Sequence, residues 1–309
     1  MPYDHVTACL TNILRAGADP NSFTDEPKGK RRTLLLVAME EAVKIDTTER
    51  IEILLQAKAD PNKPSEPPNT YPVEWAVSRG QLHLARLLLT HGADVNLPFD
   101  KNVTALHMAV HADDMDMATL LVVDHGANVN ATDIKGQTPI FFAKSRAMCG
   151  LLAAHGADLH ALNALGQSAL HLAVARDCLP VVEYLTDGSR VSGLLDAQDF
   201  QGLTALHVAA YYDNRRCVRL LLDIGADWGL RSKNGHTALS LADKQKHDQL
   251  AFYLYNRQTQ RLWGGWGVLR NPVFLVGMAV VGTAAVLRWG DIQSLVVDLF
   301  EGFRAAHTQ

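Results

Sequence analysis

Two histidines one helical turn apart form the pattern in this sequence that most resembles a metal site. His107 and His111 stand at the ends of the run HMAVH, and Asp113 and Asp114 follow shortly after it. On a helix, histidines with this spacing face the same side, which is how many zinc sites are built. Methionine replaces the glutamate that follows the first histidine in zinc proteases. We therefore expect no metal, no other cofactor and no metal-dependent catalysis.

The motifs of other common enzymes are missing from the sequence. No Gly-x-Ser-x-Gly turn, Walker phosphate loop or Gly-x-Gly-x-x-Gly loop follows a strand-like run. The 4 cysteines are scattered, without a Cys-x-x-Cys pair. Because 29 Lys and Arg face 33 Asp and Glu, the net charge of −4 gives no reason to expect nucleic-acid binding. The N-terminal stretch shows no secretory signal, so we expect the main body in the cytosol.

The elements that would position any site come from a repeat. A block reading Thr-x-Leu-His-x-Ala, or a variant of it, recurs about every 34 residues. A second block, Gly-Ala-Asp or Gly-Ala-Asn, often follows about 20 residues after the first, as at Gly92 and Gly126. Threonine is a good helix N-cap and glycine a good helix end, so the phased blocks predict a repeating pair of helices. The first block starts at Thr33, Tyr71, Thr104, Thr138, Ser168, Thr204 and Thr237.

These blocks resemble the ankyrin repeat, in which a turn precedes two antiparallel helices. The resemblance covers about residues 4–256 and implies an all-α solenoid in residues 1–256 whose first repeat is incomplete. It also implies that a protein partner, rather than a small molecule, binds the concave face of loops and first helices. Members of the family are seldom enzymes. Their histidine in the first block hydrogen-bonds within and between units, which assigns a structural role to His107.

The sequence departs from the family pattern in four ways. The unit that starts at Thr138 is about three residues short, which predicts an abbreviated helix pair. Residues 62–70 form an enlarged Pro-rich loop, and residues 20–32 form a polar insertion. Aspartate tolerates a left-handed backbone better than most residues, so the turn between helices is expected to survive where glycine is replaced. These replacements are Asp113, Asp177 and Asp213.

The resemblance also indicates which positions a partner would contact. They lie in the loops and on the first helices. Tyr211 and Tyr212 are the candidate anchors, because aromatic side chains supply large contact areas at low entropic cost. Alternatively, these aromatic residues cover the seam between repeats. The predicted contact positions are Phe99, Asp100, His111, Asp133, Ile134, Phe142, Arg176, Phe200, Tyr211 and Tyr212.

The C-terminal part of the chain has a different composition. A basic, Trp-containing linker at residues 257–270 leads to residues 271–287, which carry no charge, and an amphipathic tail follows at residues 288–309. As a helix, the uncharged run would be about 26 Å long, slightly shorter than a typical hydrocarbon core. It predicts a single membrane span with the repeats in the cytosol, or else a buried helix that caps the solenoid. The predicted membrane residues are Trp266, Arg270, Val273, Phe274, Leu275, Val276, Val280, Val281, Val286, Leu287 and Trp289.

These patterns favour a non-enzymatic adaptor that binds a protein through its repeats and is tethered to a membrane by its C-terminal helix. Two other functions remain open from the sequence. One is an unusual enzyme, or an accessory subunit of a membrane enzyme, that acts on a lipophilic substrate. The other is a soluble cytoplasmic scaffold in which residues 271–303 pack as a cap.

Overall fold

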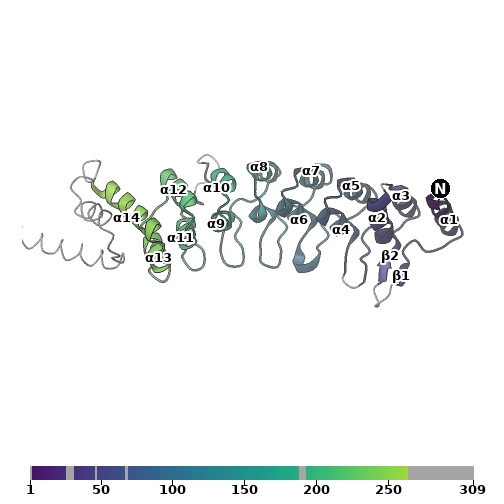
Figure 1. The fold of residues 1–309 in the computed structure, drawn as a ribbon, viewed down its shortest axis with the longest axis horizontal. Coiled ribbons are helices and arrows are strands. Elements are labelled where there is room, and N and C mark those ends of the chain that lie inside the picture. Colours follow the sequence, from purple (N-terminus) through teal and green to yellow (C-terminus); the bar gives the residue numbers. More distant parts are fainter. Residues whose placement is uncertain (1, 26–30, 46, 67–68, 188–192, 264–309) are drawn as a thin grey trace, which may run out of the picture. The chain divides into compact units, whose positions relative to one another are not determined.

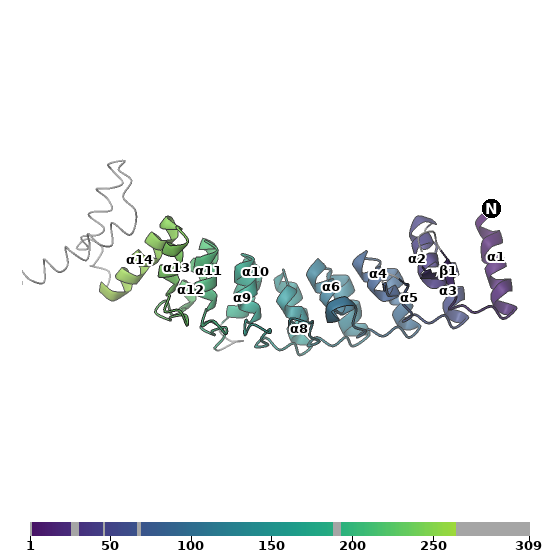
Figure 2. The ribbon, with the colours of Figure 1, turned by 90° about the horizontal axis from the view of Figure 1, so that it is seen from below.

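The structure is a computed structural model in which helices are joined in pairs (Figures 1 and 2). Their contacts divide the chain into two compact units, named unit 1 and unit 2 here. Unit 1 holds Met1–Ala173 with Pro180–Val191, and unit 2 holds Val174–Leu179 with Ser192–Gln309. The structure describes residues 2–25, 31–45, 47–66, 69–187 and 193–263.

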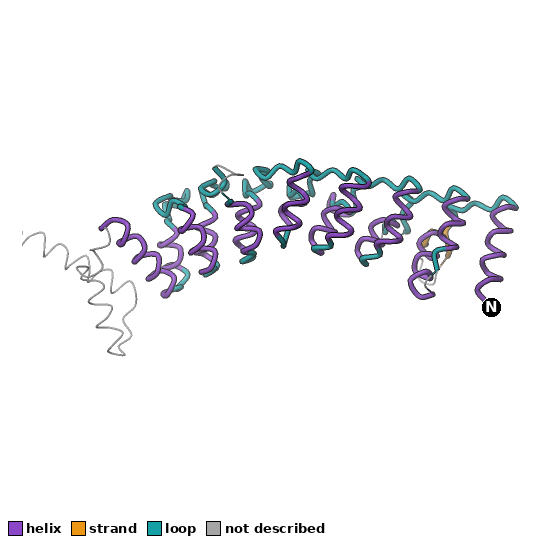
Figure 3. Tube along the Cα trace, turned by 90° about the horizontal axis from the view of Figure 1, so that it is seen from above, coloured by secondary structure: helices purple, strands orange, loops and turns teal. Residues whose placement is uncertain are grey.

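Unit 1 is a succession of helix pairs separated by loops. Helix α2 packs against α3, α4 against α5 and α6 against α7, and α4 also packs against α6 of the next pair. In Figure 3 the loops that join successive pairs of this unit lie along one edge of the helices. The elements are α1 (Pro2–Arg15), β1 (Phe23–Asp25), β2 (Arg31–Thr33), α2 (Leu34–Ile45), α3 (Glu49–Gln56), α4 (Pro72–Ser78), α5 (Leu82–Thr90), the 3₁₀ helix η1 (Asp100–Asn102), α6 (Ala105–Ala112), α7 (Met115–Thr119), the π-helical turn η2 (Leu120–Asp124), the 3₁₀ helix η3 (Pro139–Phe142) and α8 (Arg146–Ala154). Helices α9 (Ala169–Ala175) and α10 (Leu179–Thr186) contain residues of both units.

Unit 2 repeats the same organisation. Its helices are α11 (Ala205–Tyr211), α12 (Arg215–Ile224), α13 (Ala238–Lys244) and α14 (Asp248–Trp263). Helix α11 packs against α12 and against α13, which in turn packs against α14. In α12 the side chains of Cys217, Val218 and Leu221 are fully buried, while Arg216 and Arg219 are exposed. The two units therefore confirm the predicted helical repeat, with apolar helix faces covered by neighbouring helices.

A buried histidine secures the start of each first helix that carries the Thr-x-Leu-His block intact. The backbone N–H of Thr104 donates to Nδ1 of His107 at 3.2 Å, and the Thr104 hydroxyl lies 2.9 Å from the same nitrogen. Because Nδ1 accepts, the ring proton is on Nε2, which donates to the carbonyl of Gln137 in the next loop at 3.1 Å. In unit 2, His207 makes the same bonds to Thr204 and His236. The structural role predicted for this histidine is confirmed.

The short unit at Thr138 lacks both the histidine and a full first helix, whereas α2, α4 and α13 keep their helical turns without a histidine at this position. Phe141 occupies the corresponding position and is fully buried, and the first helix shrinks to the single 3₁₀ turn η3. The abbreviated helix predicted from the sequence is confirmed. Within the described residues, the buried Thr138 hydroxyl has no hydrogen-bond partner. An unpaired buried hydroxyl lowers stability, so this unit is secured less well than its neighbours.

The aspartates that replace glycine between paired helices adopt the expected left-handed backbone. Their φ angles are 57° at Asp113, 52° at Asp177 and 57° at Asp213. Each carboxylate also has a partner, which offsets part of the conformational cost. Asp113 accepts from the Ser145 hydroxyl at 2.7 Å, and Asp213 pairs with Arg215 at 2.9 Å. The replacement thus gains a polar contact that glycine cannot make.

A second set of polar bonds runs along the exposed loops. In unit 1, the side-chain oxygen of an asparagine accepts the backbone N–H of a residue 28 to 39 positions later, which lies in the next repeat. The bonds join Asn21 to Asp60 at 2.7 Å, Asn62 to Asp94 at 2.8 Å, Asn96 to Asn128 at 2.7 Å and Asn130 to Asp158 at 2.8 Å. Because each bond joins nearest neighbours only, it sets the spacing of successive repeats.

The polar insertion at residues 20–32 contains a short antiparallel hairpin, which the sequence did not indicate. Strands β1 and β2 pair with Phe23 opposite Thr33. Arg31 forms a further antiparallel bridge with Glu66 of the Pro-rich loop. Two backbone hydrogen bonds of 2.7 Å hold this bridge. The two departures from the repeat pattern therefore support each other.

The predicted membrane span cannot be compared with the structure, because residues 264–309 lie outside the described residues. This region holds every residue predicted to enter or border the membrane. In the part of the chain that the structure does describe, no helix combines the length and apolar character needed to cross a bilayer.

The cap at Thr104 should contribute measurably to stability. Thr104→Val removes a hydroxyl that lies against the buried imidazole, so we expect the free energy of unfolding to fall by about 1 kcal/mol. Thr138→Val is the matched control, since it removes an unpaired hydroxyl and should leave the free energy unchanged or raised. Urea unfolding of the full chain, followed by circular dichroism, measures both. Equal losses would show that the hydroxyl–histidine contact adds nothing.

Stability should also depend on pH through His107. Burial lowers the pKa of His107 below its ordinary value of 6.5, although the Gln137 carbonyl and the charge of Asp133 oppose this effect. Below pH 6.5 the unfolded chain therefore binds more protons here than the folded chain. We expect the free energy of unfolding to fall as the pH drops from 6.5 towards 5, and to fall less steeply in His107→Gln.

The control for this pH series is His83→Gln, which changes an exposed histidine of α5. It should keep the slope of the unmodified chain. Identical slopes in all three proteins would assign the pH dependence to other groups.

Candidate functional site

Half of the predicted contact positions lie on loops that form tight turns, which we call finger loops. Asp133 builds one of them, because its carboxylate accepts the backbone N–H groups of Lys135 and Gln137 at 2.8 Å each. Asn163 and Asp199 do the same in the loops that follow. The carboxylate of Asp133 is therefore engaged in its own turn. The finger loops are residues 99–103, 133–137 and 163–167 in unit 1, and residues 199–203 and 232–236 in unit 2.

Apolar side chains are exposed in, or directly before, the finger loops of unit 1. Ile134, a predicted contact residue, is 65% exposed. Leu162 and Leu165, which the sequence argument missed, are 53% and 62% exposed. Their loops are adjacent, since the Ala164 N–H donates to the Lys135 carbonyl at 2.8 Å. The regular finger spacing was the sequence signal that could have located these leucines.

Two predicted contact residues of the first finger loop have opposite environments. Phe99 is only 7% exposed, and its ring lies 5.6 Å from that of Tyr71. It belongs to the core, and we leave it out of the surface proposed below. Asp100 is its exposed neighbour, with an 86% exposed side chain.

His111 and Phe142 meet at the surface of unit 1. Their ring centres are 6.1 Å apart in an edge-on arrangement, and Phe142 also lies 5.9 Å from the buried His107. Across the described residues, no group of three or more His, Cys, Asp or Glu side chains is placed to hold a metal ion. His111 is exposed beside an aromatic ring, which suits contact with a partner.

In unit 2, two adjacent tyrosines form an exposed aromatic pair. Tyr211 is 45% exposed and Tyr212 56% exposed, with ring centres 5.0 Å apart and ring planes at 81°. Tyr211 ends α11, and its carbonyl accepts a hydrogen bond from His247 at 3.0 Å. Phe200 is 63% exposed at a finger tip of the same unit, and Arg176 is exposed just after α9. These side chains are therefore not packed in the core of unit 2.

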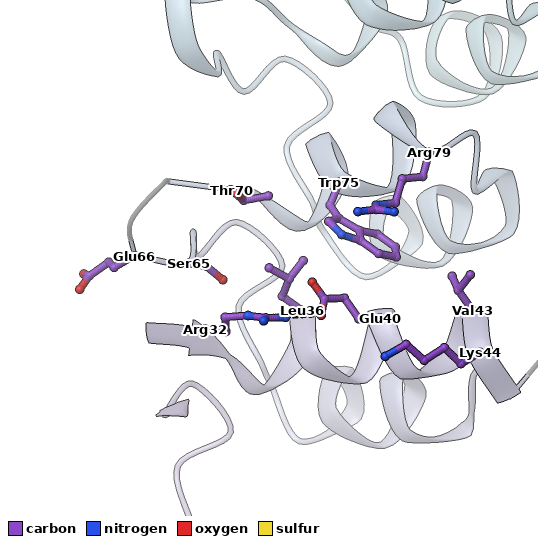
Figure 4. A pocket seen from close by; sticks show the side chains of 10 residues that line it. All are labelled: Arg32, Leu36, Glu40, Val43, Lys44, Ser65, Glu66, Thr70, Trp75 and Arg79. Atoms are coloured by element: carbon purple, nitrogen blue, oxygen red, sulfur yellow. Dashed lines mark hydrogen bonds and ion pairs between the residues drawn. The ribbon is translucent and has the colours of Figure 1, made fainter. Parts of the chain in front are cut away.

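A cavity that the sequence argument missed lies between α2 and α4 in unit 1. It has a volume of about 510 Å³, which is typical of ligand sites. Its walls include Leu36, Glu40 and Lys44 of α2, Trp75 of α4 and Arg79 directly after α4 (Figure 4). The Pro-rich loop at residues 62–70 was the sequence signal, because an insertion at this point changes how two successive first helices meet.

The buried thiol of Cys217 is not suited to nucleophilic chemistry. Burial and the neighbouring carboxylate of Asp177 raise the pKa of Cys217 to about 12. The thiol donates to that carboxylate at 3.3 Å within unit 2. Because the thiolate is the reactive form, this group stays protonated and inert near neutral pH.

Known proteins resemble the chain over its repeats. The chain is 27% identical to "Putative palmitoyltransferase ZDHHC13" of Danio rerio over 186 residues, which is 60% of this chain and 24% of that protein. It is 27% identical to "Rabankyrin-5" of Mus musculus over 245 residues, or 73% of this chain and 20% of that protein. It is 41% identical to "B-cell lymphoma 3 protein homolog" of Mus musculus over 98 residues, 30% of this chain and 22% of that protein.

The matched part of the chain thus spans about a quarter or less of each of these relatives. Family profiles match the chain over most of its helix pairs. "Ankyrin repeats (3 copies)" matches residues 39–133 and 125–193, and "Ankyrin repeats (many copies)" matches residues 190–242. With its phased helix pairs, capping histidines and finger loops, the chain belongs to the ankyrin-repeat family.

Proposed function

We propose that this chain is a non-enzymatic adaptor that binds another protein through its finger loops and first helices. Ankyrin repeats generally bind protein partners, and this role suits the exposed side chains of both units. The observation that carries the proposal is the exposed pair Tyr211–Tyr212 in unit 2. Two packed aromatic rings with free faces and little conformational freedom are typical anchors of interfaces.

A backbone hydrogen bond holds the end of the helix next to the tyrosine pair. His247 donates to the carbonyl of Tyr211, which fixes the end of α11 that carries both rings. The rings also support each other in their edge-on arrangement. A pair that is ordered before binding loses less entropy when a partner covers it. Phe200 adds a further exposed aromatic ring in the same unit.

Unit 1 would contribute a second contact region. Ile134, Leu162 and Leu165 expose apolar surface on or directly before adjacent finger loops, and His111 and Phe142 lie at the ends of two neighbouring first helices. Asp100 adds a negative charge on the finger loop at residues 99–103. Such mixed apolar and polar surface is typical of non-obligate protein interfaces.

The membrane tether is the second part of the proposal, and the sequence alone supports it. Residues 271–287 carry no charge, with Arg270 and Arg288 at their ends and tryptophan on both sides. Flanking aromatic and basic residues anchor a spanning helix at the two membrane surfaces. A tether would hold the repeats close to one membrane and so raise the local concentration of partners there.

The tyrosine pair can be tested by selective loss of binding. In Tyr211→Ala/Tyr212→Ala, we expect capture of the main partner by the full chain to fall about tenfold, because the anchor is removed. Ile224→Ala changes another exposed apolar residue of unit 2 and serves as the control. Quantitative affinity capture measures binding, and thermal unfolding measures stability. A double variant that captures as well as the control, or that unfolds at a clearly lower temperature than the control, contradicts the proposal.

The tether can be tested by alkaline carbonate extraction of membranes from cells that express the full chain. A spanning helix should keep the chain in the membrane pellet. Val276→Arg/Val280→Arg places two charges in the uncharged run and should release the chain, since each costs about 3 kcal/mol near the membrane centre. Thr308→Arg is the control outside the run. If the unmodified chain is extracted as readily as the double variant, residues 271–287 do not span the membrane.

A further inference from the structure

The cavity between α2 and α4 contains a buried polar group that lacks a partner. Trp75 is 6% exposed, and within the described residues its indole Nε1–H makes no hydrogen bond. Leaving a buried donor unpaired costs free energy that a bound acceptor recovers. In Figure 4 the indole extends from α4 into the cavity, towards Leu36 and Glu40 of α2. An acceptor that enters this cavity and reaches Nε1 would supply the missing partner.

The packing of the helices explains why the cavity exists here. Helix α4 packs closely on α6, and α11 on α13, whereas α2 and α4 touch far less. The Pro-rich loop carries Ser65, whose hydroxyl accepts the Thr33 N–H at 3.3 Å, and this bond holds the loop at one side of the cavity. The side chains that line α2 lie at helical spacing, so one face of α2 forms a wall.

The charges of the cavity favour an anion. Arg32 is paired with Glu40, and Arg31 with Glu66, so both cavity carboxylates already have cationic partners. Arg79 stacks on the Trp75 ring, with its guanidinium carbon 4.8 Å from the ring centre. In the described part of the chain, neither Arg79 nor Lys44 has an acidic partner. Two cations and an indole donor are therefore presented to whatever enters.

The remaining lining is apolar. Leu36 forms the floor and is 3% exposed, whereas Val43 is 48% exposed at the rim. The face of the Trp75 ring adds aromatic surface between them. A ligand that fits this lining carries a negative group next to an apolar group. Neighbouring acidic and apolar side chains of a polypeptide have this chemistry.

We propose that the cavity between α2 and α4 binds an acidic segment of a partner polypeptide. One carboxylate of the segment accepts from Trp75 Nε1–H and lies between Arg79 and Lys44, while an adjacent apolar side chain contacts Leu36 and Val43. This inference rests on the proposed role in protein binding and deepens it by naming the chemistry of one contact. It uses unit 1 only and is independent of the tyrosine pair.

The first test measures binding of the full chain to an array of capped hexapeptides that contain every residue pair at their centre. Pairs of an apolar residue with Asp or Glu should bind about tenfold more tightly than the same pairs with Asn or Gln. Arg79→Gln should abolish this preference. Arg219→Gln is the matched control, because Arg219 stacks on Tyr253 in unit 2 but lies outside the cavity. Equal binding of acid and amide peptides, or an unchanged preference in Arg79→Gln, overturns the proposal.

The second test follows the indole N–H directly. The chain has 5 tryptophans, and the nitrogen–proton NMR signal of Trp75 is identified by its loss in Trp75→Phe. The best acidic peptide should move this signal downfield, and the shift should reach a plateau as the peptide concentration rises. The amide counterpart should not move the signal. If succinate saturates the same signal at the same concentration, the ligand is a small free acid and the peptide assignment is wrong.

The two proposals fail in different ways. Tyr211→Ala/Tyr212→Ala should lose capture of the main partner but keep the preference for acidic peptides. Loss of that preference in this double variant would place acid binding in unit 2 and overturn the cavity proposal. Conversely, Arg79→Gln should weaken capture of the main partner, but by less than Tyr211→Ala/Tyr212→Ala does.

Discussion

The fold depends on a buried imidazole that is hydrogen-bonded to two neighbouring repeats at once. His107 accepts from its own N-cap and donates to the carbonyl of Gln137 in the next loop. Both bonds require the neutral ring with its proton on Nε2. A single side chain thus fixes where a helix begins and how far away the next finger loop lies. The position of the finger loop that exposes Ile134 depends on that distance.

Because each repeat is linked only to its neighbours, a local change in sequence has a local effect on structure. The short unit at Thr138 loses a helix but not its place in the row of repeats, since Asn130 still bonds to Asp158. The insertion at residues 62–70 opens a cavity beside α2 without disturbing the bond between Asn62 and Asp94. Such arrays tolerate variation in one repeat because the contacts that hold the next repeat are separate from it.

The repeat itself could be predicted because its signals are periodic and local. Thr104 and His107 lie three residues apart, and the left-handed aspartates stand at fixed positions after the first helix. The cavity could not be predicted in this way. Whether Trp75 reaches a partner depends on the distance between two helices that an irregular loop separates, and no local pattern encodes that distance.

The exposure of single loop residues depends on their position within the finger loop. Phe99 and Phe200 both lie in finger loops, yet one packs against Tyr71 and the other is exposed. Phe99 is the first residue of its finger loop, a position that is also buried at Asn163, Asp199 and Ser232, whereas Phe200 is the second, a position that is also exposed at Ile134. The sequence argument placed both residues in loops but did not distinguish these two positions.

The environments of the cysteines have a practical consequence for studying this protein in solution. Cys149 and Cys217 are fully buried, and the second is also held protonated by its surroundings, whereas Cys9 is exposed. A maleimide dye added at neutral pH will therefore react with Cys9 far faster than with either buried thiol. Cys178 is only partly buried, so placing a single fluorophore on α1 also requires Cys178→Ser.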